Sequence, residues 1–268
     1  MVLAVVRIAA LPYACSSFEQ DGYLTPLDVL SASEINATRA AFDKLQAMSG
    51  VLAPLVDQHM KEPFLWDLVT NTRLLDSVGC ILGPDVMVLG SQFFCKPPST
   101  FAPRRGAHIS YHQDVYYWGL DPAEAVSAWI AIDDVDNENG CMRVLKSSHR
   151  KLLPHGTSQR PGNMLSVNQE IDSEHLRTFP HEQAIILKAG QSSLHDGRAV
   201  HASFPNTSPT RRRCGLAVRY ISPHVQPRLP ASDEEINQVD SWRPVLVRGR
   251  DTFGHWKGRE VPTPACAS

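Results

Sequence analysis

Three side chains in the sequence have the types and spacing of a metal site. His112 and Asp114 lie two residues apart in the segment Tyr111–Asp114, and His201 follows in a separate candidate strand. Residues i and i+2 of a β-strand point to the same face, so His112 and Asp114 can reach one ion together. Two histidines and one carboxylate form the facial triad that binds non-haem iron(II) and leaves coordination positions open. We therefore expect a metal centre at these three residues.

A competing cluster lies close to the third of these residues. His195 and Asp196 precede His201 in the segment His195–His201 and could also contribute to a metal site. We favour the pair at 112 and 114 because the dipeptide Asp196-Gly197 is typical of a turn. A histidine and an aspartate at this spacing also arise by chance, usually on a solvated strand edge. The surrounding sequence must therefore support the assignment.

The elements that must position these residues are predominantly β-strands. Short β-rich runs bounded by Pro, Gly, Asn or Asp lie at 86–96, 126–132, 141–145, 183–190 and 214–222. Many short strands at such spacing indicate a sandwich or a closed barrel. Helical patterns come first and strands afterwards, without βαβ alternation, which argues against a doubly wound sheet.

The N-terminal third is predicted to be helical. Ser31 and Glu34 have the spacing of a capping box, in which each side chain accepts a hydrogen bond from the other residue's backbone N–H. The helix that they begin is expected to end at Gly50. Two further helices are expected near Val51–Glu62 and Leu65–Gly79.

Length and composition favour one globular domain. The 268 residues are 43% hydrophobic and 20% charged, which is sufficient for a folded core. We expect a single domain over residues 1–268, with a helical part at about 18–83, a β core at about 84–223 and an irregular, loosely packed tail at 224–268.

Charge and cysteine usage narrow the possible partners. The formal net charge of −2 gives no basic footprint for nucleic acid. No stretch of the sequence approaches the ~18 apolar residues that a membrane-spanning helix needs. The six cysteines form no CxxC pair, so free thiols in a reducing, cytoplasmic location are expected. A secretory signal is disfavoured because Arg7 interrupts the first apolar run and no clean cleavage site follows. The sequence leaves the oligomeric state unknown.

Several segments resemble the phytanoyl-CoA dioxygenase family of iron(II)/2-oxoglutarate oxygenases. They are FEQDGYL at 18–24, FFCKPPS at 93–99, YHQD at 111–114, SAWIAIDDVDNENGCMRVLKSSH at 127–149 and HASFPNTSPTRRRCGLAVRYISP at 201–223. Several motifs in order are more specific than any one of them. The resemblance implies a mainly β fold with N-terminal helices, built as a double-stranded β-helix (jelly-roll, cupin-like) barrel whose inner strands hold the metal.

The resemblance also implies an arginine that binds the far carboxylate of 2-oxoglutarate, within Arg211–Arg213. A buried carboxylate requires a bidentate and permanently charged partner. Counting forward from His201 favours Arg212, whereas counting back from Tyr220 along the strand favours Arg213. We prefer Arg213 because register within a strand is stiffer than the length of a loop.

The resemblance also assigns roles to residues elsewhere in the chain. The resemblance assigns His112, Asp114 and His201 as catalytic iron ligands, and Ser203, Gln92, Ser127 and Trp129 as further contacts of the co-substrate. Trp129 could equally be a core aromatic residue, and Gln92 could bind a backbone group of the barrel. Tyr116, Tyr117 and Trp118 are expected to line an aromatic substrate pocket, and Lys96, Arg104 and Arg105 could attract an anion.

The activity implied by the resemblance is a dioxygenase reaction. Fe(II), 2-oxoglutarate and O2 would be used to oxidise, and most simply to hydroxylate, a small organic substrate of natural-product metabolism, with release of succinate and CO2. An acyl-CoA or free-acid hydroxylase of the same mechanism is the alternative substrate class. A non-catalytic ligand-binding barrel is the alternative outside enzymes. A zinc hydrolase with the same ligands would have no use for the arginine.

Overall fold

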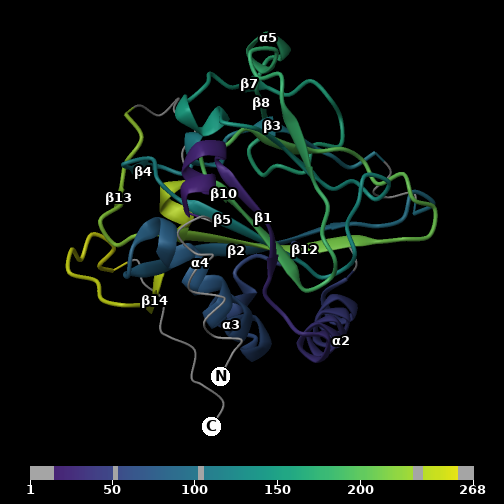
Figure 1. Ribbon diagram of the computed structural model, residues 1–268, viewed down its shortest axis with the longest axis horizontal. Helices are drawn as coiled ribbons and strands as arrows, with labels where there is room; N and C mark the ends of the chain where they lie inside the picture. The colour runs from purple at the N-terminus through teal and green to yellow at the C-terminus, as the bar shows by residue number, and fades with distance from the viewer. Residues whose placement is uncertain (1–14, 51–53, 102–105, 232–237, 259–268) are drawn as a thin grey trace.

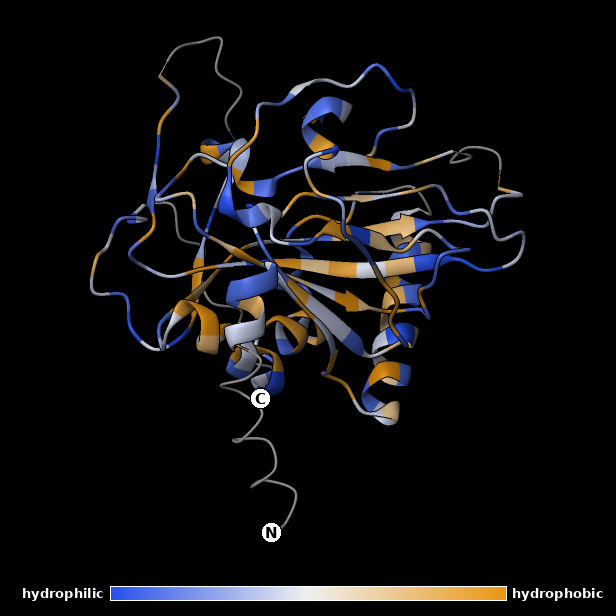
Figure 2. Cartoon of the chain, turned by 45° about the horizontal axis from the view of Figure 1, so that its top comes forward, coloured by the Kyte–Doolittle hydropathy of each residue, from blue (hydrophilic) through white to orange (hydrophobic). Residues whose placement is uncertain are grey.

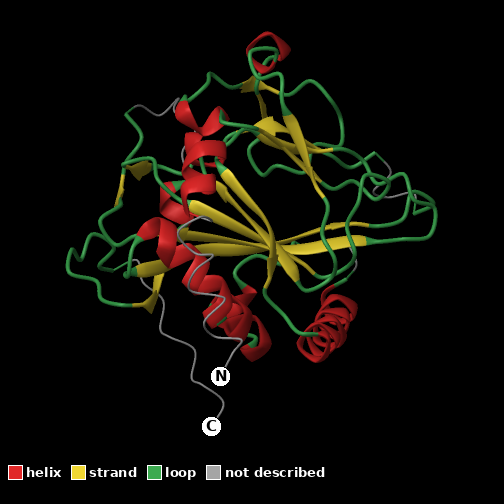
Figure 3. Cartoon of the chain, viewed as in Figure 1, coloured by secondary structure: helices red, strands yellow, loops and turns green. Residues whose placement is uncertain are grey.

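Two antiparallel β-sheets face one another in the computed structural model, which describes residues 15–50, 54–101, 106–231 and 238–258 (Figure 1). The six-stranded sheet has the order β1-β10-β5-β12-β2-β14, and the four-stranded sheet has the order β3-β11-β6-β9. Helices cover the outer face of the larger sheet (Figure 3). The fold is the predicted double-stranded β-helix, or jelly roll.

The predicted strands are present. The larger sheet contains β1 (Tyr23–Asp28), β2 (Val86–Lys96), β5 (Val126–Ala131), β10 (Gln191–Asp196), β12 (Arg213–Ile221) and β14 (Val245–Arg248). The smaller sheet contains β3 (Ile109–His112), β6 (Met142–Leu145), β9 (Glu182–Ile185) and β11 (His201–Ser203). Two short pairs join β4 (Leu120–Asp121) to β13 (Gln226–Pro227) and β7 (Gly156–Thr157) to β8 (Gln169–Glu170). Short helices lie at η3 (Asp114–Tyr116), η4 (Ser148–Arg150), α5 (Ser173–Leu176) and η5 (Val239–Ser241).

The capping box at Ser31 is confirmed. The Ser31 hydroxyl accepts a hydrogen bond from the backbone N–H of Glu34 at 3.3 Å, and the Glu34 carboxylate accepts one from the backbone N–H of Ser31 at 2.6 Å. Helix α2 (Ala32–Ser49) begins there, and Gly50 follows its end with a φ of 94°. The local pattern alone was sufficient to predict both ends.

The next two helices differ from the prediction. The segment Leu65–Gly79, which was expected as one helix, is divided between α3 (Pro63–Val69) and α4 (Thr72–Leu82). The Asn71 side chain accepts hydrogen bonds from two backbone N–H groups and so begins the second helix. Within the described part of 51–62 the only helix is the short η1 (Gln58–Met60), and residues 51–53 lie outside the described residues.

The larger sheet separates two environments through the alternation of its side chains. One face of β12 packs on the helices through Leu216, Val218 and Tyr220, and the other lines an internal cavity through Arg213, Ala217 and Arg219. Successive residues of a strand point to opposite faces, so one strand can serve an apolar core and a polar site. Figure 2 shows the hydrophobic residues gathered in the central strands and the helices beneath them.

Segments outside the predicted β core complete the larger sheet. β1 pairs with β10 at one edge and β14 pairs with β2 at the other. The prediction of a loosely packed tail was wrong, because Trp242 and Trp256 are 7% and 0% exposed and pack in one apolar cluster with Trp118. Large aromatic side chains gain much from burial, and their N–H groups here reach backbone carbonyls.

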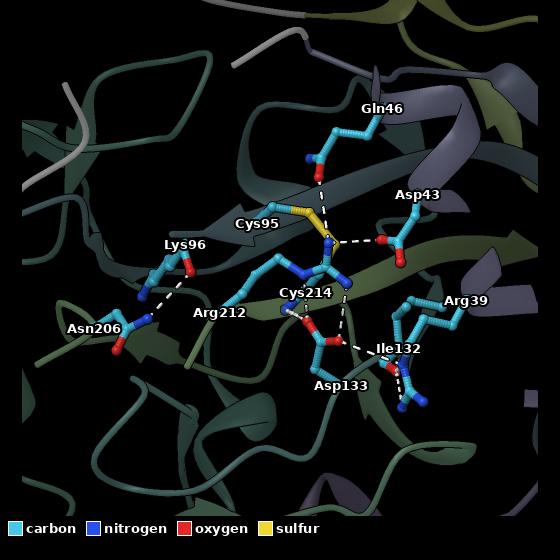
Figure 4. Close-up of a disulfide and its surroundings, with 10 residues drawn as sticks. All are labelled: Arg39, Asp43, Gln46, Cys95, Lys96, Ile132, Asp133, Asn206, Arg212 and Cys214. Carbon is cyan, nitrogen blue, oxygen red and sulfur yellow. Dashed lines mark hydrogen bonds and ion pairs between the residues drawn. A yellow bond between two sulfur atoms is a disulfide. The ribbon is translucent and has the colours of Figure 1, made fainter. Parts of the chain in front are cut away.

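The prediction of free cysteines is also corrected. Disulfides join Cys15 to Cys80 and Cys95 to Cys214, Cys141 is free and buried, and the sixth cysteine lies outside the described residues. Cys95 and Cys214 are 119 residues apart in sequence, yet they are direct neighbours across β2 and β12 (Figure 4). No short spacing in the sequence could have indicated this pair. Among the described residues, no helix is both long and apolar enough to cross a bilayer.

The docking of the tail can be tested by truncating a buried side chain. Trp256 is fully buried and donates a hydrogen bond to the carbonyl of Val225 at 2.8 Å. We expect Trp256→Ala to lower the free energy of unfolding by about 3–5 kcal/mol in urea titrations. Phe253→Ala is the control in the same segment, because Phe253 is 55% exposed. Equal stability of the two variants would contradict a docked tail.

Candidate metal centre and its cavity

The structure brings the three predicted ligand residues together. His112 ends β3, His201 begins β11, and the two residues are direct cross-strand partners. The prediction that Asp114 shares a strand face with His112 was wrong, because β3 ends at His112 and Asp114 begins the helical turn η3. The turn carries its carboxylate back toward both imidazoles, and one ligand atom from each of the three lies within 4.8 Å of the others.

The ring orientations leave one nitrogen of each histidine for the centre of this cluster. His112 Nδ1 lies 2.9 Å from the carbonyl of Ser110, and His201 Nδ1 lies 3.0 Å from that of Ala199. A carbonyl accepts only from a protonated nitrogen, which leaves the lone pair on Nε2. The two Nε2 atoms lie 3.3 and 3.9 Å from Asp114 Oδ1. This is the donor arrangement of a facial metal site.

The carboxylate and the loop that holds it are fixed by buried polar contacts. The Ser127 hydroxyl donates to Asp114 Oδ2 at 2.9 Å. Gln113 lies between the two ligands in sequence and is fully buried. Its side chain accepts from the N–H of Leu153 at 2.7 Å, and its backbone N–H donates to His155 Nε2 at 2.9 Å. The segment is therefore held in place from behind by neutral hydrogen bonds.

Burial and proximity shape the protonation of the cluster. Burial acts to raise the pKa of Asp114, but the neighbouring His201 and the contacts with His112 and His195 outweigh it and hold this pKa well below its usual range. Burial, followed by the nearby His112 and His195, lowers the pKa of His201 well below its usual range. An ionised carboxylate beside a neutral imidazole is the state that a divalent metal requires.

A cavity of about 370 Å³ opens from these residues between the two sheets. It contains the predicted co-substrate residues Gln92, Ser127, Trp129, Ser203 and Arg213. Tyr117 and Trp118 also line it, as expected, whereas Tyr116 stacks on His155 with ring centroids 4.0 Å apart. Arg104 and Arg105 lie outside the described residues.

Arg213 is a buried cation that forms no ion pair with the described residues. It is 1% exposed, its Nε and one terminal nitrogen make no hydrogen bond, and burial lowers the pKa of its guanidinium to about 10. The guanidinium lies over the Trp129 ring at 4.4 Å from the centroid. A Cβ on Gly215 would overlap that ring, so only glycine lets Trp129 lie there. The arrangement leaves a positive group open toward the cavity.

Arg212 lies on the opposite side of the strand and is fully engaged (Figure 4). Its guanidinium binds Asp133 at 2.9 and 3.1 Å, Asp43 at 2.7 Å and Gln46 at 3.4 Å. The adjacent disulfide to Cys214 lies beside this network. Of the two arginines that the sequence left open, only Arg213 lines the cavity.

Lys96 is the other buried cation near Arg213. Its ammonium group donates to the Ser203 hydroxyl at 2.7 Å and to the carbonyl of Phe204 at 2.5 Å. Burial and then the charge of Arg213 lower the pKa of Lys96 well below its usual range. Because Lys96 occupies a lone pair of Ser203, the serine proton is free to point elsewhere. Lys96 therefore acts on the cavity through Ser203.

The competing cluster at 195–201 does not form a second site among the described residues. Both oxygens of Asp196 contact Arg198 at 2.9–3.0 Å. His195, however, is buried, has no hydrogen-bond partner on either ring nitrogen and lies 3.6 Å from Asp114 Oδ2. It is a third imidazole of the cavity, and the sequence suggested it only as a rival ligand.

Arg219 and Trp242 are among the cavity residues that the sequence analysis did not predict. Arg219 lies six residues beyond Arg213 on β12, so both side chains point to the same face of the strand. Trp242 belongs to the C-terminal tail. The alternation of β12 could have indicated Arg219. Nothing local could have indicated Trp242, which reaches the cavity only through the docking of the tail.

Comparison with known proteins identifies the family of the chain. The family model "Phytanoyl-CoA dioxygenase (PhyH)" matches residues 18–214. The chain belongs to the phytanoyl-CoA dioxygenase family. It is 24% identical over 223 residues to bovine peroxisomal phytanoyl-CoA dioxygenase, covering 73% of this chain and 64% of that protein, so the match spans less than two thirds of that relative. It is 26% identical over 223 residues to an ectoine dioxygenase of Nocardia farcinica, covering 74% and 73%.

Solved structures of this family's fold are similar over most of the chain. The non-heme monooxygenase ThoJ is 28% identical, with a TM-score of 0.70 and coverage of 93% of this chain and 87% of that one. The epimerase SnoN, solved in complex with Fe3+, alpha ketoglutarate and nogalamycin RO, is 20% identical with a TM-score of 0.70, covering 90% of this chain and 100% of that one. At that identity, the likeness to SnoN shows the fold alone.

The buried contact of His155 predicts a pH dependence of stability. Burial lowers the pKa of His155 from 6.5 to about 4. Between these values the unfolded chain binds a proton that the folded chain does not, so unfolding becomes easier as pH falls from 6.5 to 4. This residue contributes up to about 1.4 kcal/mol per pH unit. We expect urea titrations of His155→Gln to show a shallower decline than the wild type.

His255→Gln is the matched control, because His255 is exposed. The control should follow the pH profile of the wild type. A His155→Gln profile parallel to that of the wild type would show that His155 is protonated equally in both states.

Proposed function

We propose that the chain is an Fe(II)/2-oxoglutarate-dependent dioxygenase that oxidises a small organic substrate, most simply by hydroxylation, and releases succinate and CO2. The observation that carries the proposal is the buried Arg213, which forms no ion pair with the described residues and lies in the same cavity as the His-Asp-His cluster. A metal site alone would fit a hydrolase, whereas a metal site facing a buried cation fits a chelating dicarboxylate. Membership of the family adds support.

The residues that line the cavity fit both Fe(II) and 2-oxoglutarate. Two imidazole nitrogens and one carboxylate are the donor set of non-haem iron(II), with open positions for other ligands. When bound, the iron would supply the coupling of O2 reduction to decarboxylation of 2-oxoglutarate and oxidation of the substrate. Arg213 would bind the far carboxylate of 2-oxoglutarate. The Ser203 hydroxyl would donate a hydrogen bond to the same carboxylate.

Other residues would orient these partners. Ser127 fixes the carboxylate of Asp114. Trp129 covers the Arg213 guanidinium and excludes water from it, which strengthens the attraction of that cation for a carboxylate. Gln92, whose amide oxygen already accepts from Arg219 at 3.3 Å, would contribute to the cavity wall.

The size of the cavity favours a compact substrate. At about 370 Å³ it lies near the lower end of the roughly 300–1,000 Å³ of small-molecule pockets, and 2-oxoglutarate must share it. An acyl-CoA substrate would have to leave its nucleotide outside. We retain a single domain over residues 1–268 and a small-molecule partner, without nucleic acid, as parts of the proposal. The cytoplasmic location stays a prediction, against which the two disulfides weigh.

Removal of a ligand should abolish metal binding without unfolding the chain. We expect His112→Ala and His201→Ala each to lose stoichiometric Fe(II) binding in anaerobic calorimetry, together with succinate release from 2-oxoglutarate. His224→Ala, outside the cavity, should keep both. Circular dichroism would verify the fold of each variant. Full iron binding by either ligand variant would refute the proposed triad.

The two neighbouring arginines provide a matched pair for co-substrate binding. Arg213→Gln should raise the 2-oxoglutarate concentration at half-maximal succinate release by about 30- to 1,000-fold, since loss of buried charge-assisted hydrogen bonds costs roughly 2–4 kcal/mol. Arg212→Gln should leave that concentration unchanged and lower the thermal midpoint, because Arg212 binds Asp133 and Asp43 outside the cavity. The reverse ranking would assign the carboxylate to Arg212.

A further inference from the structure

A second cation lines the cavity and is not used by the proposed co-substrate site. Arg219 is half-buried, and among the described residues it has no carboxylate within ion-pair distance. Its one hydrogen bond to a side chain goes to the amide oxygen of Gln92 at 3.3 Å. The two carboxylates that line the cavity have other partners. Asp114 belongs to the ligand cluster, and Asp57 accepts a hydrogen bond from the backbone N–H of Ser91 at 2.7 Å.

Arg219 and Arg213 leave β12 at positions that lie far apart along the strand. They are six residues apart on one strand, which corresponds to about 20 Å of strand at roughly 3.3 Å per residue. Arg219 lies directly across from Ser127, whose hydroxyl holds Asp114. The Arg219 side chain therefore extends from the sheet beside the candidate metal centre, where a substrate would lie.

Two tryptophans form an apolar platform around this cation. The Arg219 guanidinium lies 5.4 Å from the ring centroid of Trp118 and 6.0 Å from that of Trp242. The two rings meet edge to face at 5.6 Å, and Trp242 Nε1 donates to the carbonyl of Trp118 at 2.9 Å. A Cβ on Gly90, the partner of Arg219 on β2, would lie 2.9 Å from the Trp242 ring, so glycine is required there.

We propose that Arg219 is the specificity-determining residue of the substrate site and binds an anionic oxygen group of the substrate, a carboxylate or a phosphate, whose apolar body packs on Trp118 and Trp242. This inference rests on the proposed function, because it takes the cavity as the place of oxidation. A guanidinium beside aromatic rings presents its remaining N–H groups as a fork that matches a planar or tetrahedral oxyanion. The substrate class is thus a compact organic acid.

The test is calorimetric binding of simple probes to the full chain loaded with Mn(II) and saturated with 2-oxoglutarate. The probes are phenylacetate, phenyl phosphate and the neutral phenylacetamide. We expect one of the two anions to bind at least about tenfold more tightly than the amide, and the stronger anion identifies the group. Equal binding of the amide and both anions would overturn the proposal.

The variants separate this site from that of the co-substrate. Arg219→Gln should weaken the preferred anion by about 10- to 100-fold and leave 2-oxoglutarate binding unchanged, with Arg219→Lys in between. Arg213→Gln should lose 2-oxoglutarate, and Arg248→Gln, an ion-paired arginine on β14, should change neither. Unaltered anion binding by Arg219→Gln would overturn the inference alone. A chain that binds the anion through Arg219 but never binds 2-oxoglutarate would overturn the proposed function and support the anion site.

Discussion

A buried positive charge with no counterion among the described residues is the constraint on which the rest of the site depends. Arg213 is 1% exposed, and the groups around it are a tryptophan face and the cation of Lys96 rather than a carboxylate. Transfer of a charge into a protein interior is costly unless the charge is paired. The fold accepts this cost at Arg213, which faces the His-Asp-His cluster, where a dicarboxylate bound to a metal would supply the missing anion.

The jelly roll makes this placement possible because its strands have two unlike faces. On one side of β12, Leu216, Val218 and Tyr220 join the core with helices α3 and α4. The opposite side carries Arg213 and Arg219 into the cavity. The apolar face stabilises the strand, and the polar face is therefore held rigidly without contributing to the core. The smaller sheet adds the two histidines from adjacent strands, which closes the site from the other side.

Much of the fold and part of the candidate site could be predicted from local sequence patterns. The strands appeared as short β-rich runs between turn residues, and the capping box at Ser31 located a helix start. His112 and Asp114 were identified by their spacing, although Asp114 reaches the site from a helical turn rather than a strand. The docked tail, the disulfide between Cys95 and Cys214 and the approach of Trp242 were not predictable. Each depends on residues far apart in the chain, and no local pattern encodes such contacts.

The sequence by itself determined the family, the succession of helices and strands, and the residue types of the metal site, because these follow from short-range periodicity and ordered motifs. Only the tertiary structure shows that Arg213 lines the cavity and Arg212 does not, because the two residues are chemically identical and adjacent. The reason is the pleat of β12 and its register with β2, which turn Arg213 toward the cavity and Arg212 toward Asp133 and Asp43. The same register places Arg219 across from Ser127, beside the metal ligands.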